Sequence, residues 1–135
     1  MRILTLLSPQ KLIIRLALEI SKRKRLKKLK NTPGKYLKAG HIDSLELLEA
    51  IIGNDPALLE KAVIYDIGSN TGSWTLLAKS LLPGAEVHAF EPLETHIAAF
   101  NKHCNGLEKV ILHPYCLGNE NNKKVLNISS YSDSF

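Results

Sequence analysis

One stretch, from Val63 to Trp74, most constrains what this 135-residue chain can fold into. It reads Val-Ile-Tyr-Asp-Ile-Gly-Ser-Asn-Thr-Gly-Ser-Trp, so an apolar strand pattern ends near the acid Asp66 and a glycine loop leads into a helix. That order places backbone N–H groups at a helix N-terminus, beside the carboxyl end of a buried strand, where nucleotide-like ligands bind. Glu91 lies 19 residues beyond Gly72, after the next predicted strand, and this is where a partner for ribose hydroxyls is expected.

The second half of the chain alternates strand and helix patterns. Ala62–Ile67 is a continuous apolar run with β-branched residues, which predicts a strand buried on both faces. Strands that alternate with helices at these short intervals indicate an α/β fold, with a parallel sheet and right-handed crossovers. We expect further strands at Glu86–Phe90 and Lys109–His113, a fourth candidate at Val125–Ile128, and helices at Gly72–Leu82 and Leu93–Cys104.

Helices are predicted before the sheet. Ser8 and Pro9 have the pattern of an N-cap and a first helical residue, and an amphipathic helix is expected from there to about Lys30. A shorter helix is expected at Ser44–Ile52, ended by Gly53.

Charge divides the chain into two parts. Residues 1–38 hold 12 Lys or Arg and one acid, whereas residues 39–135 hold six Lys or Arg and 12 acids. We therefore predict a basic amphipathic helical segment at 1–38 and a ligand-binding domain at 39–135. Only 69 residues follow Asp66, which is too few for the two βαβαβ halves of a complete doubly wound domain. The domain is thus expected to be the N-terminal half of a larger fold, incomplete at its C-terminal side.

Other cofactors and metals fit the sequence less well. The dinucleotide pattern G-x-G-x-x-G, started at Gly68, would need glycines where the chain has Asn70 and Ser73, and no G-K-[ST] ending marks a phosphate loop. The cysteines and histidines lack the spacing of a metal site, so none is predicted. Tyr65 and Trp74 are expected to pack in the core or against the loop.

The pattern Asp66-x-Gly68-x-Asn70-x-Gly72 resembles motif I of the class I S-adenosylmethionine-dependent methyltransferases. With Asn70 in place of a middle glycine, it is similar to the FkbM-type family, as are Phe90-Glu91-Pro92 and Cys116-Leu117-Gly118-Asn119. The resemblance covers about residues 42–128. It implies a Rossmann-like methyltransferase sheet, S-adenosylmethionine as cofactor, and transfer of a methyl group to a hydroxyl of a glycan or small-molecule acceptor.

Eight residues are candidates for cofactor binding. Gly68 allows a tight turn and close approach of a ligand, and Gly72 lets the helix sit near the strand. Asn70 tolerates left-handed backbone angles. Asp66 is expected to order the loop and draw the cationic amino group of the ligand, and Glu91 to accept two hydrogen bonds from a ribose diol. Ser69 is expected to add either a polar contact with the ligand or a hydrogen bond within the loop. The resemblance implies that Pro92 and Leu93 flank the adenine. No catalytic residue is predicted.

The segment Lys22–Lys30 carries seven positive charges in nine residues, which suits a membrane surface, nucleic acid, an acidic partner, or a helix packed on the domain with its charges in water. The apolar residues before it favour a membrane surface over nucleic acid, and the lack of interleaved aromatic residues counts against single-stranded nucleic acid. Neither a membrane span nor a signal peptide is predicted, so we expect a cytoplasmic protein, with peripheral membrane contact through the basic helix as one alternative. The alternative to an enzyme is a non-catalytic, truncated cofactor-binding or interaction module tethered by its basic helix.

Overall fold

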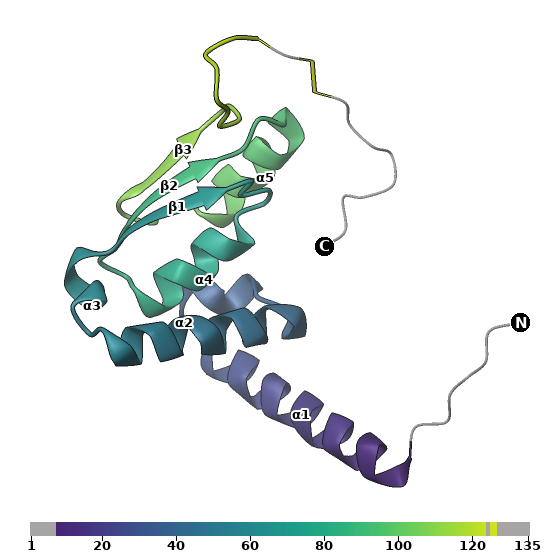
Figure 1. Ribbon diagram of the computed structural model, residues 1–135. Helices are drawn as coiled ribbons and strands as arrows, with labels where there is room; N and C mark the ends of the chain where they lie inside the picture. Colours follow the sequence, from purple (N-terminus) through teal and green to yellow (C-terminus); the bar gives the residue numbers. More distant parts are fainter. Residues whose placement is uncertain (1–7, 124, 127–135) are drawn as a thin grey trace, which may run out of the picture.

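Three parallel strands form the sheet, in the order β1-β2-β3 (Figure 1). The computed structural model describes residues 8–123, 125 and 126. Within that part the strands are β1 (Val63–Ile67), β2 (Glu86–Phe90) and β3 (Val110–His113). The sheet and its helices make a mixed α/β fold compatible with the predicted Rossmann-like arrangement. The fourth strand candidate, at 125–128, extends outside the described residues.

Both crossover helices, α4 (Ser73–Leu81) and α5 (Glu94–His103), lie on one face of the sheet (Figure 1). The strands follow each other across the sheet in one direction, and right-handed crossovers in one direction place every connecting helix on the same side. The prediction that β1 is buried on both faces is therefore wrong, because no helix or strand of the described residues covers the other face, called the bare face below. Val63, Tyr65 and Ile67 point to that face and are 54%, 63% and 65% exposed.

The helices before the sheet agree with the predicted pattern, with shifted ends. Ser8 caps the first helix, as predicted, by accepting a hydrogen bond from the Lys11 N–H. Gly53 lies inside the second main helix and does not end it. The elements of this part are α1 (Pro9–Lys28), η1 (Pro33–Tyr36), η2 (Ala39–His41), α2 (Ile42–Asn54) and α3 (Leu58–Lys61).

Three buried clusters hold these elements together. The first joins the C-terminal end of α1, called its base below, to η1, α2 and α4. The second lies between α4, α5 and the sheet. The third packs at the start of β1. Their buried members are Leu29, Leu37, Ile42, Leu45 and Leu77; Leu76, Ala89, Phe100 and Cys104; and Ala62, Leu82 and Ala85. Trp74 was expected in the core or against the loop; it is not in the core, since it lies at the start of α4 and is 49% exposed.

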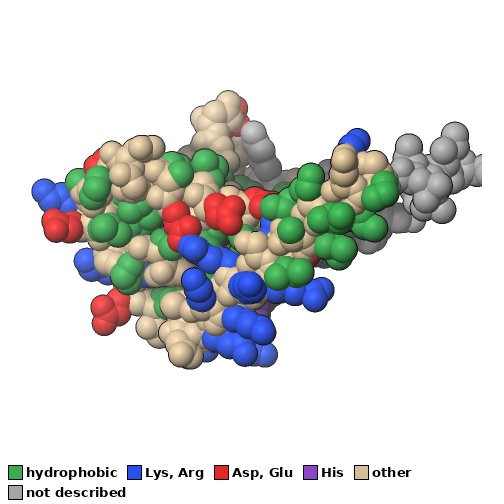
Figure 2. Space-filling view, turned by 90° about the horizontal axis from the view of Figure 1, so that it is seen from below, with side chains coloured by type: hydrophobic (Ala, Val, Ile, Leu, Met, Phe, Trp, Pro, Cys, Tyr) green, Lys and Arg blue, Asp and Glu red, His purple; other side chains and the backbone are tan. Residues whose placement is uncertain are grey.

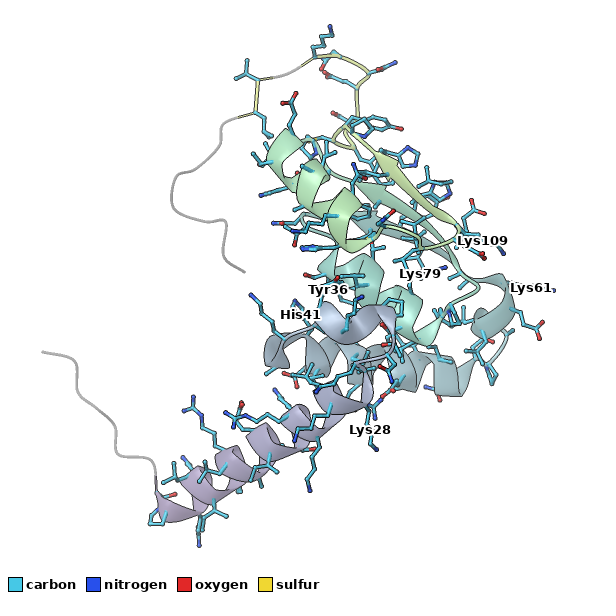
Figure 3. The ribbon with its side chains drawn as sticks, turned by 180° about the vertical axis from the view of Figure 1, so that it is seen from behind. Lys28, Tyr36, His41, Lys61, Lys79 and Lys109 are labelled. Carbon is cyan, nitrogen blue, oxygen red and sulfur yellow. The ribbon has the colours of Figure 1, made fainter. Side chains whose placement is uncertain are left out.

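Lys79 is a buried cation that closes the C-terminal end of α4 (Figure 3). Its ammonium donates hydrogen bonds to the carbonyls of Pro83 at 2.6 Å and Ala85 at 2.8 Å, in the turn before β2. Burial lowers the pKa of Lys79, and the nearby Lys109 lowers it further. A cation at this position stabilises the negative end of the helix dipole and so fixes the path from α4 into β2.

No helix in the described part of the chain combines the length and apolar character needed to cross a membrane.

Candidate functional site

The glycine loop between β1 and α4 has the backbone conformation that its sequence predicts. Gly68, Asn70 and Gly72 all have positive φ angles, of 76°, 48° and 88°. The N–H groups of Gly68 and Ser69 both donate to the Phe90 carbonyl, at 2.9 and 3.0 Å. The loop is thereby fixed across the carboxyl ends of β1 and β2, the edge of a parallel sheet where ligands bind.

Gly72 is packed against the helix that follows β2. A Cβ built on Gly72 would lie 2.8 Å from the Cys104 Sγ and 2.9 Å from the Phe100 Cδ2. Only a residue without a side chain fits this gap, so Gly72 lets the loop pack closely against α5. The predicted role of Gly72, bringing α4 near the strand, stays a prediction. Gly68 has no atom within 4 Å of such a Cβ, so its side faces open space above the loop.

Asp66 is directed at the first turn of α4. Its Oδ2 accepts a hydrogen bond from the Thr75 hydroxyl at 2.7 Å, and the Thr75 backbone also donates to the carboxylate. Because Gly72 at the N-cap has no side chain, Asp66 takes the place of a capping residue. Burial raises the pKa of Asp66, and the bonds from Thr75 oppose this only in part.

Glu91 binds the glycine loop from the end of β2. Its Oε2 accepts a hydrogen bond from the Asn70 N–H at 2.9 Å, and its Oε1 accepts one from the Leu93 N–H at 2.9 Å. The His96 Nδ1 lies 3.3 Å from the same Oε1. A carboxylate offers about four acceptor positions, so one remains on Oε2. The expected pair of bonds to a ribose diol remains a prediction, and in this conformation it requires one of these protein donors to move.

The other predicted site residues lie around this contact. Ser69 is buried, and its hydroxyl is the single buried side-chain N or O atom without a hydrogen-bond partner among the described residues. Such an orphaned group costs about 1–3 kcal/mol until it finds a partner. Pro92 and Leu93 follow Glu91 directly and are half-buried at the start of α5.

Two histidines of α5 support the loop and the residue next to it, and neither was among the predicted site residues. His96 faces Glu91, and the His103 Nδ1 lies 2.8 Å from the Thr71 carbonyl oxygen. Their spacing of seven residues is two helical turns, which places both on one side of the helix. This spacing does not suit a metal site, and it is the sequence signal from which a shared contact with the loop could have been predicted.

A chain of polar contacts crosses the bare face of the sheet. Glu86 Oε1 lies 2.9 Å from His88 Nε2, and His88 Nδ1 lies 3.0 Å from His113 Nε2. The series ends at the Tyr115 hydroxyl, 3.1 Å from His113 Nδ1. Tyr65 stacks on His88 with ring centroids 5.4 Å apart. These side chains alternate along β1, β2 and β3, and their common face could have been inferred from the period of two.

An open hollow of about 390 Å³ borders β1, lined by four consecutive strand residues, Ile64–Ile67, and by Trp74. No residue of β2 lines it, so it lies toward the outer edge of β1. Asp66 and the exposed Trp74 ring thus flank one space beside the glycine loop, large enough for part of a nucleoside-sized ligand.

The two thiols are expected to differ sharply in reactivity. Cys104 is buried beneath Gly72, and burial, with a contribution from Asp66, raises its pKa to about 12, whereas Cys116 is exposed. The thiolate is the reactive form, so iodoacetamide at pH 8 should label Cys116 rapidly and Cys104 only after unfolding. Mass spectrometry of peptides after timed labelling measures both rates. Rapid labelling of Cys104 in a folded Cys116→Ser variant would contradict the packing of Gly72 against α5.

No protein-family model and no curated protein sequence matches this chain.

Proposed function

We propose that this chain binds S-adenosylmethionine at the carboxyl ends of β1 and β2 and serves as the cofactor-binding part of a methyltransferase. The observation that carries the proposal is the hydrogen bond between Asn70 N–H and Glu91 Oε2, which joins two motif residues 21 positions apart. It brings the glycine loop and the predicted ribose partner to one place. Two further features support it, the positive φ angles of the loop and the hollow beside Asp66.

The proposed ligand contacts follow from this arrangement. The adenosine and its ribose would lie over Gly68 and the exposed Asn70, near Glu91, with Pro92 and Leu93 beside the adenine. The cationic amino group of the ligand would face Asp66, whose carboxylate is half-buried. The acceptor we propose, from the family resemblance, is a hydroxyl of a sugar or small metabolite, and methyl transfer then depends on holding that oxygen in line with the methyl group.

A second candidate, a non-catalytic cofactor-binding or interaction module, is favoured by one specific observation. The carboxylates of Asp66 and Glu91 are both hydrogen-bonded within the protein, to Thr75 and to the loop and α5. Polar groups satisfied in this way can serve to shape the loop without a ligand.

Calorimetric titration with S-adenosylhomocysteine, run beside NAD, tests the proposal. We expect saturable binding of the first ligand alone. In the variant Asp66→Asn/Glu91→Gln, loss of hydrogen bonds to charged groups should weaken binding at least about tenfold. The matched control is Glu60→Gln/Glu108→Gln, which alters two exposed acids away from the loop and should bind like the unaltered chain.

Three results would count against the proposal. Saturable binding of NAD would indicate a different cofactor, and equal affinity in the two double variants would remove Asp66 and Glu91 from the site. Absence of binding by a chain shown by circular dichroism to be folded would favour the interaction module.

A further inference from the structure

The N-terminal half of α1 exposes an unusual amount of aliphatic surface. Six large side chains in the first 12 residues of α1, called its aliphatic half below, are 50–66% exposed, and no residue of α1 is buried. Exposed apolar surface of this extent on a folded chain marks an interaction site. The six residues are Leu12, Ile13, Ile14, Leu16, Leu18 and Ile20.

The other half of α1 is held on the domain. Leu29, directly after the helix, is buried in the first core cluster, and Leu26 packs against it. Lys22 forms an ion pair with Asp43 of α2 at 3.0 Å, and Arg25 pairs with Glu49 of the same helix. The helix is thus fixed at its base, and its aliphatic half extends away from the sheet and its helices (Figure 1).

Cations surround the base of α1. Five of the seven Lys and Arg residues in Lys22–Lys30 are exposed and form no ion pair among the described residues. Figure 2 shows Lys and Arg side chains gathered next to the hydrophobic side chains on this side of the molecule, and Figure 3 shows Lys28 where the helix meets the domain. The five are Arg23, Lys24, Lys27, Lys28 and Lys30.

We propose that α1 docks this chain on an anionic lipid surface, with its aliphatic half in the interface and its free cations at the lipid phosphates. The cations indicate that the partner is anionic. The aliphatic residues on the same helix indicate a lipid surface, because the phosphate backbone of a nucleic acid offers them no apolar contact. Tryptophan, tyrosine and phenylalanine are absent from α1, so it offers no stacking platform for bases. This inference is independent of the proposed cofactor.

Co-sedimentation of the full chain with vesicles tests the inference. We expect binding to phosphatidylcholine vesicles that contain phosphatidylserine, little binding to phosphatidylcholine alone, and a decrease with added salt. In Arg23→Gln/Lys24→Gln/Lys27→Gln the partition coefficient should fall roughly a hundredfold, at about fivefold for each cation. In Ile13→Gln/Leu16→Gln it should fall about tenfold or more, because apolar surface no longer enters the interface.

The matched control is Lys61→Gln/Lys102→Gln/Lys123→Gln, which removes three exposed cations away from α1 and lowers the net charge equally. The altered side chains of all three variants are largely exposed, so circular dichroism should show an unchanged fold. Equal losses in the control and the α1 cation variant would overturn the proposal, as would binding that ignores phosphatidylserine. A chain that binds single-stranded DNA but not the anionic vesicles would assign α1 to nucleic acid.

Discussion

Replacement of Gly72 by alanine should lower the free energy of unfolding by about 3 kcal/mol. One part of this loss is the left-handed backbone, since φ is 88° and a side chain there costs about 1–2 kcal/mol. The other part is steric, because the new methyl group would lie 2.8 Å from Cys104 Sγ and 2.9 Å from Phe100. Forcing a group into a packed core costs about 1–3 kcal/mol. Urea denaturation followed by circular dichroism gives the difference.

Gly68→Ala separates the two contributions. Gly68 also has a positive φ, of 76°, but a methyl group there meets nothing within 4 Å. Only the backbone strain remains, so the loss should be about 1.5 kcal/mol. Equal losses at the two glycines would mean that α5 does not pack against Gly72 in solution.

Leu77→Ala should be as damaging, with a loss of about 3 kcal/mol of unfolding free energy. Leu77 is 1% exposed and lies where α4 meets the base of α1, η1 and α2. Truncating a buried leucine removes apolar contacts and leaves a cavity, at a cost of about 2–5 kcal/mol. The same urea titration measures it.

Leu47→Ala is the matched control, because the same atoms are removed from a leucine of α2 that is 61% exposed. The expected change is within about 0.5 kcal/mol. If Leu77→Ala proved equally mild, the first core cluster would not be formed in solution, and α1 would lack the base from which it extends.

Local patterns predicted the elements of the α/β part well. The predicted strands match β1, β2 and β3 to within one residue at every end, and the loop from Gly68 to Gly72 has the left-handed angles that its residues indicate. Both depend on the residues themselves or on their immediate neighbours, and such information is present in a single sequence.

Properties that depend on distant segments were predicted less well. The apolar run of β1 does not reveal whether a second layer covers it, so Tyr65 and Ile67 were placed in a core and are exposed. Glu91 was assigned to a ligand from its position along the chain. Its contacts with the Asn70 N–H and His96 depend on how the loop and α5 pack around the end of β2. The cofactor, the acceptor and the lipid surface remain predictions.

The one-directional strand order gives β1 a particular position in the topology. Its outer edge has no neighbouring strand in the described part of the chain, and one of its faces is bare. A further parallel strand beside β1 would follow β3 in the chain but lie at the opposite edge of the sheet. The connection to it would therefore run across the sheet in the opposite direction to the first two. If that connection is right-handed, its helix lies on the bare face. A single such reversal would cover Tyr65 and Ile67 and open a crevice beside Asp66, because neighbouring connections would diverge to opposite faces at that point.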